Sequence, residues 1–181
     1  THNYNLISST SEEIEGDVLN DICEVGFITK PSSEDELVSE KVITEKVVLI
    51  SPINYDIPEK ISLKKILDYK LIILKESCII KDNLREGLSS IGYTFADLDI
   101  MSRLETTEAI KTLVQKGYGT ALVPYNSVKD EYTADELKIS RIEDYNLDYN
   151  IYMIRKKSEN LTSDLKEFIQ GFKNLGPNIC C

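Results

Sequence analysis

The stretch TTEAIKTLVQKGYGTALVP, Thr106–Pro124, predicts a helix that turns through glycine into a short buried strand. One helical face carries the apolar residues Ala109, Ile110, Leu113 and Val114. Thr106 or Thr107 suits the N-cap of this helix, and Gly117 is typical of the residue just past a helix end. Thr120–Val123 is an apolar strand, closed by a proline that cannot donate to a ladder. A helix returning into a buried strand indicates an α/β protein, in which ligands bind at the carboxyl ends of the strands.

The length and the net charge of the chain limit the number of domains and the kinds of ligand that it can bind. The chain has 181 residues, with 21 Lys plus Arg against 31 Asp plus Glu and a formal net charge of −10. This length allows one ordinary domain or two small lobes. The hydrophobic share of 41% is sufficient for a packed core. The excess of acidic residues argues against binding of this chain to the phosphates of a nucleic acid. Main-chain N–H groups could still bind a small anion.

Membrane, metal and cofactor signals are missing from the sequence. No apolar run is long enough to span a bilayer, and no basic leader precedes an apolar stretch. The cysteines match no zinc-binding spacing, and the single histidine is His2. The four cysteines are Cys23, Cys78, Cys180 and Cys181. We therefore expect a reducing, cytoplasmic location, no metal, no cofactor and no membrane partner.

The rest of the chain alternates between predicted strands and helices. Strands are predicted at residues 5–8, 25–29, 42–51, 71–74, 99–104, 139–142 and 150–155, and helices at residues 12–19, 63–69, 80–91 and 163–175. Thr10 with Glu13 forms a capping box, and Ser62 and Thr162 suit the N-caps of later helices. Such alternation predicts parallel sheets.

Two of these strands suggest a division into lobes. The long strand 42–51 and the late strand 150–155 could both pass from one lobe to the other. Residues 46–144 would then form one compact α/β lobe. Residues 1–45 and 145–181 would together form the other lobe.

Four segments, in order along the chain, carry a family resemblance. They are residues 3–28, EKVVLISP at 45–52, ISLKKILDYKLIILKES at 61–77 and ETTEAIKTLVQKGYGTALVP at 105–124. Their order and spacing resemble the effector-binding (regulatory) domain of LysR-type transcriptional regulators. Glu24 stands where that family usually has an aspartate.

The resemblance implies an α/β fold of two Rossmann-like lobes joined by two crossover strands, as in type 2 periplasmic binding proteins. It also implies a small-molecule effector between the lobes, pairing of such domains into a homodimer or homotetramer, and DNA binding through an N-terminal helix-turn-helix. That DNA-binding segment is absent from this chain. The domain's first strand and helix also have no counterpart here, so we expect the natural protein to begin upstream of Thr1. The missing strand would lie between residues 5–8 and 25–29.

Hydroxyl-bearing residues recur where strands lead into helices, and in the family these loops line the effector cleft. The candidate effector-binding residues are Ser9, Thr10, Ser11, Thr29, Ser77, Cys78, Thr106 and Thr107. Backbone N–H groups and the positive helix end at such turns suit a carboxylate or another oxyanion. Each residue could equally be an ordinary N-cap that needs no ligand. Cys78 could also be a redox-sensing or metal-sensing thiol.

The leading functional hypothesis is therefore an effector-sensing, non-catalytic domain of a transcription regulator. The alternative is a solute-binding protein or an enzyme on the same two-lobe fold, such as a dehydratase of aromatic amino-acid synthesis. An enzyme needs a positioned acid, base or nucleophile, and the hydroxyl clusters offer no evident His, Lys or carboxylate set. The identity of the effector is not encoded in any of these patterns.

Overall fold

The chain crosses between two structural units twice, after Thr44 and after Tyr149. The computed structural model describes residues 7, 9–75, 78–157 and 162–175. The first unit comprises the described residues up to Thr44 and those from Asn150 onward, and the second unit is Glu45–Tyr149. The sequence predicts these crossings after residues 45 and 144. The predicted strand at 5–8, Ser77, Cys180 and Cys181 lie outside the described residues.

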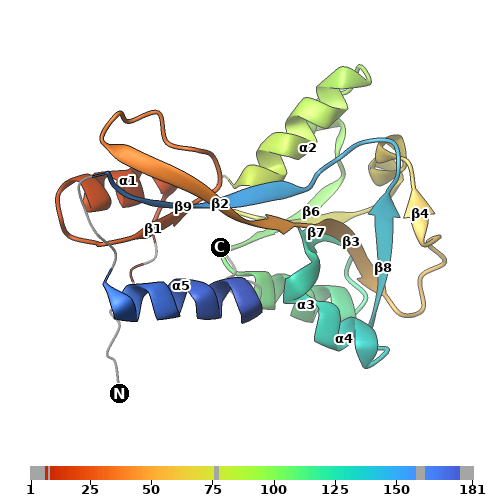
Figure 1. Cartoon of the computed structure of the whole chain (residues 1–181). Coiled ribbons are helices and arrows are strands. Elements are labelled where there is room, and N and C mark those ends of the chain that lie inside the picture. Colours follow the sequence, from red (N-terminus) through yellow and green to blue (C-terminus); the bar gives the residue numbers. More distant parts are fainter. Residues whose placement is uncertain (1–6, 8, 76–77, 158–161, 176–181) are drawn as a thin grey trace. The chain divides into compact units, whose positions relative to one another are not determined.

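A three-stranded sheet and two helices make up the first unit (Figure 1). Its elements are α1 (Ser11–Leu19), β1 (Gly26–Ile28), β2 (Leu37–Glu45), β9 (Tyr149–Lys156) and α5 (Ser163–Leu175). The strand order is β1-β9-β2, and β1 runs antiparallel to β9 with Gly26 opposite Ile154. Val18 of α1 packs with Ile28, Leu37 and Ile154 to form the core.

Local capping fixes where two helices of this unit begin. The Thr10 hydroxyl accepts a hydrogen bond from the Glu13 N–H, and the Glu13 carboxylate accepts one from the Thr10 N–H. The predicted capping box of α1 is thus confirmed. The Thr162 hydroxyl accepts a hydrogen bond from the Leu165 N–H (3.3 Å), so the predicted cap of α5 is also confirmed.

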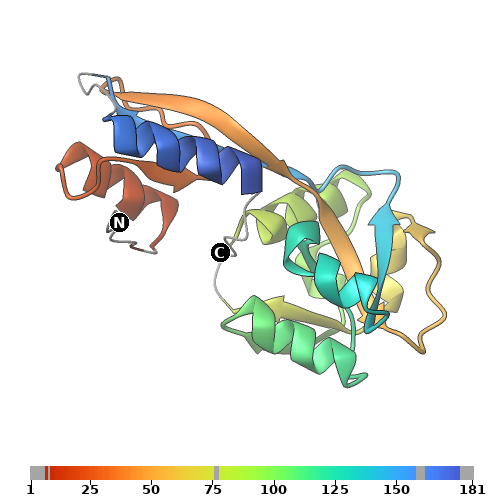
Figure 2. The same ribbon diagram turned by 60° about the horizontal axis from the view of Figure 1, so that its bottom comes forward.

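The second unit has helices on both sides of a mixed sheet (Figure 2). Its strands are β3 (Val47–Pro52), β4 (Lys60–Ile61), β5 (Leu71–Leu74), β6 (Ile100–Leu104), β7 (Ala121–Pro124) and β8 (Leu137–Ile142). Its helices are η1 (Leu63–Asp68), α2 (Ile79–Ser90), η2 (Phe95–Asp97), α3 (Thr107–Gln115), η3 (Tyr125–Ser127) and α4 (Lys129–Thr133). The order β4-β8-β3-β7 continues into the β5–β6 pair through a parallel bridge between Leu71 and Thr120. All six residues of β3 are buried, so β3 is the centre of this unit.

The expectation of parallel sheets is wrong for the central strands. β5 pairs with β6, and β4 with β8, in parallel, but β3 runs antiparallel to both β7 and β8. The reason is that β3 is a connecting strand that enters from the first unit. It therefore runs against β7, which follows a helix within the unit.

The predicted long strand at residues 42–51 is also wrong, because it is two strands interrupted at Lys46. At this break the Lys46 carbonyl accepts a hydrogen bond from the Tyr125 N–H (2.7 Å). The Val47 N–H donates to the Asp148 carboxylate (2.9 Å). At this point, where the chain passes from the first unit to the second, hydrogen bonds to Tyr125 and Asp148 therefore take the place of continuous strand pairing.

Ser62 does not cap the helix that follows it, in contrast to the prediction. At the same helix start, the Leu63 N–H donates to the carboxylate of Asp144 (2.6 Å). The helix itself is of the 3₁₀ type over Leu63–Asp68. A carboxylate 81 residues beyond Leu63 thus satisfies one of the free N–H groups at this helix start, although not the one that a serine cap would have bonded.

Gly119 lies where two backbones approach closely, and it provides a stability test. A Cβ atom at this position would lie 2.8 Å from the Lys70 carbonyl oxygen, which also accepts the Thr120 N–H. We expect Gly119→Ala to lower the free energy of unfolding by about 1–3 kcal/mol, measured by chemical denaturation. Gly16→Ala is the control, since nothing lies within 4 Å of its Cβ and alanine favours the helix. Unchanged stability of the Gly119 variant would contradict this account.

Candidate functional site

Two helices begin at the same edge of the second unit's sheet. β5 leads to Cys78, which is the N-cap of α2, and β6 leads to Thr106, which is the N-cap of α3. Because β5 and β6 are parallel neighbours, their carboxyl ends share one edge. Both helices therefore present backbone N–H groups and positive dipole ends there. We call the residues Lys75, Cys78 and Glu105–Thr107 the β5–β6 edge.

The two threonines of this edge have different surroundings. The Thr106 hydroxyl accepts a hydrogen bond from the Ala109 N–H (3.2 Å) and is exposed, so its own O–H remains able to donate. Thr107 is 5% exposed, and its hydroxyl has no hydrogen-bond partner among the residues that the structure describes. The first turn of α3 thus combines backbone donors with two hydroxyl groups.

Cys78 occupies the corresponding position on α2. Its backbone is extended, its side chain is half-buried, and its sulfur makes no cap hydrogen bond. The first N–H groups of α2 therefore receive no acceptor from this side chain. Such groups are open to an acceptor from a ligand.

Lysines supply positive charge around the edge. Lys75 forms an ion pair with Glu105 (3.2 Å) that links the loops after β5 and β6, and the Lys75 N–H donates to the Leu104 carbonyl (2.6 Å). Lys81 on α2 donates to the Lys75 carbonyl (3.3 Å). Both ends of the ion pair are largely exposed, so it contributes at most about 1 kcal/mol and can yield to a ligand. The edge is therefore suited to an anion.

The other described candidates belong to the first unit. Ser9 and Thr10 both hydrogen-bond the Glu13 carboxylate, and these bonds, the one from Ser9 above all, lower the pKa of Glu13. Ser11 is the first residue of α1, and Thr29 follows β1 directly. The ordinary capping role thus accounts for the hydroxyls of Ser9 and Thr10.

A third element, which was not among the sequence-predicted candidates, also reaches the β5–β6 edge. β7 runs parallel to β5 through the Leu71–Thr120 bridge, so its carboxyl end and η3 (Tyr125–Ser127) reach the same edge. The Asn126 amide donates to the Glu45 carboxylate (2.9 Å). Polar residues directly after an apolar strand are the signal that marked the other candidates, and the same rule would have included this turn.

Lys111 of α3 holds that turn in place. It is buried, and its ammonium group donates to the Ser127 carbonyl (2.9 Å) and pairs with Glu131 (2.7 Å) and Glu108 (2.8 Å). Burial lowers the pKa of Lys111, but the bonds to Glu108 and Glu131 outweigh it and the net shift is upward. A buried lysine within an apolar helix face gives no sequence signal of its partners, which lie up to 20 residues away.

The comparison with protein families decides the identity of this fold. The family model of the LysR substrate binding domain matches residues 3–176. The chain belongs to this family. An uncharacterized HTH-type transcriptional regulator of Methanocaldococcus jannaschii is 27% identical to this chain over 152 residues. The match covers 83% of this chain and 50% of that protein. The chain spans about half the length of the curated relatives it matches.

Solved structures agree with this fold. The effector-binding domain of QuiR in complex with shikimate has a TM-score of 0.71 at 17% identity, covering 91% of this chain and 77% of that one. The regulatory domain of Synechocystis PCC6803 CcmR in complex with 2-PG has a TM-score of 0.74 at 16% identity, covering 94% and 82%. The predicted fold class and family are thereby confirmed.

The described residues contain neither a candidate metal-binding cluster nor a candidate membrane span. Within the described ranges, no group of three or more His, Cys, Asp or Glu side chains is placed to hold a metal ion. Among those same residues, no helix has both the length and the apolar character needed to cross a bilayer.

Proposed function

We propose that the LysR domain binds a small anionic effector at the β5–β6 edge, where α2 and α3 begin. The observation that supports this most directly is the hydroxyl of Thr107, unpaired among the described residues, on a residue with only 5% exposure in the first turn of α3. It lies at the same edge as the start of α2, which has no side-chain cap. Lys75 and Lys81 supply positive charge nearby. Thr106 would donate its hydroxyl to the same ligand. Ser9, Thr10, Ser11, Thr29 and Ser77 remain candidates for further contacts.

The effector acts by changing the relative populations of two conformations of the domain. It stabilises the conformation that binds it more tightly, and that change passes to a DNA-binding segment elsewhere in the regulator. The two units serve as the two lobes of the family's fold. We further propose that the domain is not an enzyme, that it works in the cytoplasm and that it pairs as a homodimer or homotetramer. The structures with shikimate and 2-PG support a small-molecule ligand of this kind.

A thermal-shift panel of small carboxylates, sugar acids and phosphate esters tests the proposal. We expect at least one compound to raise the melting temperature of the wild-type chain, since a ligand that binds the native state alone stabilises it. Thr107→Val should weaken binding of that compound about 10-fold to 100-fold, the effect of losing a hydrogen bond to a charged group. Calorimetric titration measures the affinity.

Thr112→Val is the matched control on the same helix. The Thr112 hydroxyl donates to the Glu108 carbonyl within α3, at a distance from its N-terminus. This variant should keep the wild-type affinity. Equal affinity of the Thr107 variant would place the site elsewhere, and no stabilisation by any compound would count against effector binding. Recovery of a chemically altered compound would favour the enzyme alternative.

A further inference from the structure

The two segments that connect the units are tied together by side chains. The Thr44 hydroxyl and the Asn150 side-chain carbonyl form a hydrogen bond (2.8 Å). Three residues further along the first segment, the Val47 N–H donates to the Asp148 carboxylate (2.9 Å). We call residues 44–47 and 148–150 the junction. Any change in the relation of the two segments must alter these bonds.

Glu45 lies in the junction as a buried carboxyl group with one oxygen unpaired. The residue is 2% exposed. Its Oε1 accepts a hydrogen bond from the Asn126 amide of η3 (2.9 Å), while its Oε2 is buried with no partner among the described residues. A buried carboxylate without a full set of donors is strongly disfavoured relative to the neutral acid.

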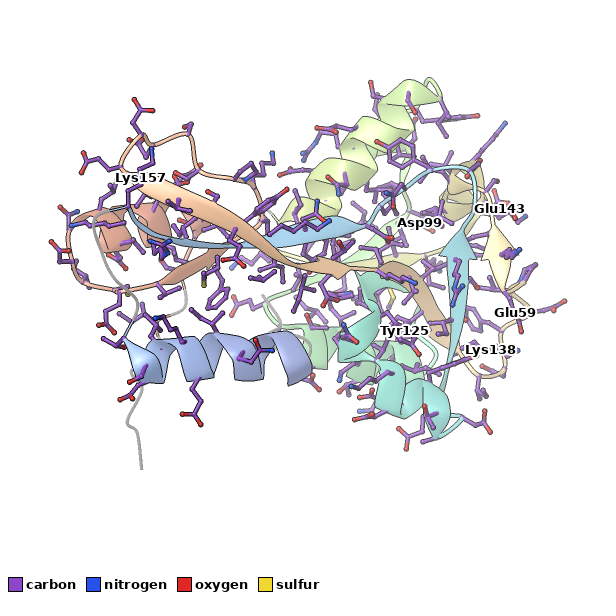
Figure 3. All side chains as sticks on the ribbon, viewed as in Figure 1. Glu59, Asp99, Tyr125, Lys138, Glu143 and Lys157 are labelled. Carbon is purple, nitrogen blue, oxygen red and sulfur yellow. The ribbon has the colours of Figure 1, made fainter. Side chains whose placement is uncertain are left out.

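The charges around Glu45 reinforce this preference. From the second connecting segment it faces the Asp148 carboxylate, and from η3 it faces the neutral Asn126 amide. Tyr125, the first residue of η3 (labelled in Figure 3), bonds through its N–H to the neighbouring Lys46 carbonyl. Lys46 beside it is exposed, and the buried Lys111 is engaged with Ser127 and two glutamates. No lysine or arginine of the described residues therefore pairs with Glu45.

Burial is the main cause that raises the pKa of Glu45 above its ordinary value of 4.5. The hydrogen bond from Asn126 opposes this shift, and the negative charge of Asp148 adds to it. The burial of Glu45 and the direction of its pKa shift therefore both favour the neutral carboxyl group.

We propose that Glu45 is a proton-linked latch: as a neutral acid it stays buried and holds η3 against the first connecting segment. The ionised carboxylate is a better acceptor for Asn126, but burial and the Asp148 charge favour its exit toward water, and that exit releases η3. η3 is also the element that Lys111 ties to α3 through the Ser127 carbonyl. A change at Glu45 therefore reaches both the junction and the end of β7. The latch rests on the junction alone and requires no effector.

The sign of the pH dependence follows from the raised value. The stabilising contribution of neutral Glu45 is complete below pH 4.5, the ordinary value, and is lost as the pH rises through the folded-state pKa. Glutamine at this position keeps the shape and stays neutral at every pH. The wild type should therefore lose stability relative to Glu45→Gln as the pH increases.

Thermal unfolding of the full chain between pH 4.5 and pH 8 tests the latch. The melting temperatures of Glu45→Gln and wild type should be closest at pH 4.5. The variant should then gain roughly 3–5 °C over wild type for each pH unit up to the folded pKa of Glu45. Glu59→Gln is the control, because Glu59 is an exposed glutamate of the same unit (Figure 3). Its difference from wild type should not change with pH.

Two results would overturn the proposal. One is a Glu45→Gln difference that stays constant, or turns against the variant, as the pH rises. The other comes from the wild-type protein and applies even if the variant does not fold. Carbon-13 NMR of the side-chain carboxyl group should give Glu45 a titration midpoint above 4.5, and a midpoint at or below this value removes the latch. Neither result bears on effector binding.

Discussion

Replacing Lys111 by methionine is expected to lower the free energy of unfolding of the second unit by about 3 kcal/mol. The substitution keeps most of the aliphatic volume but removes the donor to the Ser127 carbonyl and to the carboxylates of Glu131 and Glu108. Removing one partner of a buried pair typically costs about 3–5 kcal/mol, and the partial exposure of Glu131 reduces this figure. Chemical denaturation followed by circular dichroism measures the change.

The same helix offers a matched control in Lys116. This residue is exposed at the end of α3, so Lys116→Met should change stability by no more than about 0.5 kcal/mol. If both substitutions lowered the free energy of unfolding equally, the buried bonds of Lys111 would stabilise the fold no more than a surface charge does.

The loss of stability in acid gives a second measure of the bonds that Lys111 makes to Glu131, Glu108 and the Ser127 carbonyl. Burial raises the pKa of Glu131, but its bond to Lys111 outweighs this and leaves the value below 4.5. A lowered folded-state pKa gives stability that is present above 4.5 and is lost as the pH falls through that pKa. The Lys111 variant should lose part of this acid sensitivity.

Replacing Ile50 by alanine is expected to cost about 3–4 kcal/mol, the largest effect of a single truncation proposed for this chain. Ile50 is fully buried in β3, opposite Ala121 of β7 and Ile139 of β8. It belongs to the core cluster that includes Ile110 of α3. Because strands hold it on both sides, the surrounding backbone cannot easily collapse into the cavity. Equilibrium denaturation in urea gives the value.

Two isoleucine substitutions bracket this expectation. Ile50→Val removes one methylene group and should cost about 1 kcal/mol. Ile53→Ala lies just past β3 at a residue that is 48% exposed, and it should cost much less than the Ile50 truncation. A loss below 1.5 kcal/mol for Ile50→Ala would contradict the central role of β3.

Features with local causes could be predicted from the sequence. The cap at Thr106, the turn at Gly117 with a φ of 83°, and the capping box of α1 all depend on residues within four positions of one another. Their side chains specify backbone geometry regardless of the rest of the fold. Cys78, Thr106 and Thr107 were predicted as effector-binding candidates from the same kind of local signal, and that role remains a prediction.

Features with distant causes could not be predicted. Glu45 looked like one more residue of an apolar strand, because its partner Asn126 lies 81 residues away. The break after Glu45 was equally hidden, because the carboxylate that accepts the Val47 N–H belongs to Asp148, 101 residues beyond Val47. The antiparallel setting of β3 likewise depends on which strands it meets, and alternation of apolar residues carries no information on direction.

The strand order β1-β9-β2 has a consequence for how the chain folds during synthesis. β9 is the middle strand of the first unit's sheet, yet it leaves the ribosome after the whole second unit, Glu45–Tyr149, has been made. The second unit is continuous in sequence and can fold first. Its folding then brings the ends of a long insertion together, which removes most of the loop-closure entropy that β9 would otherwise face in reaching β1 and β2. The first sheet is therefore the last part of the chain to form.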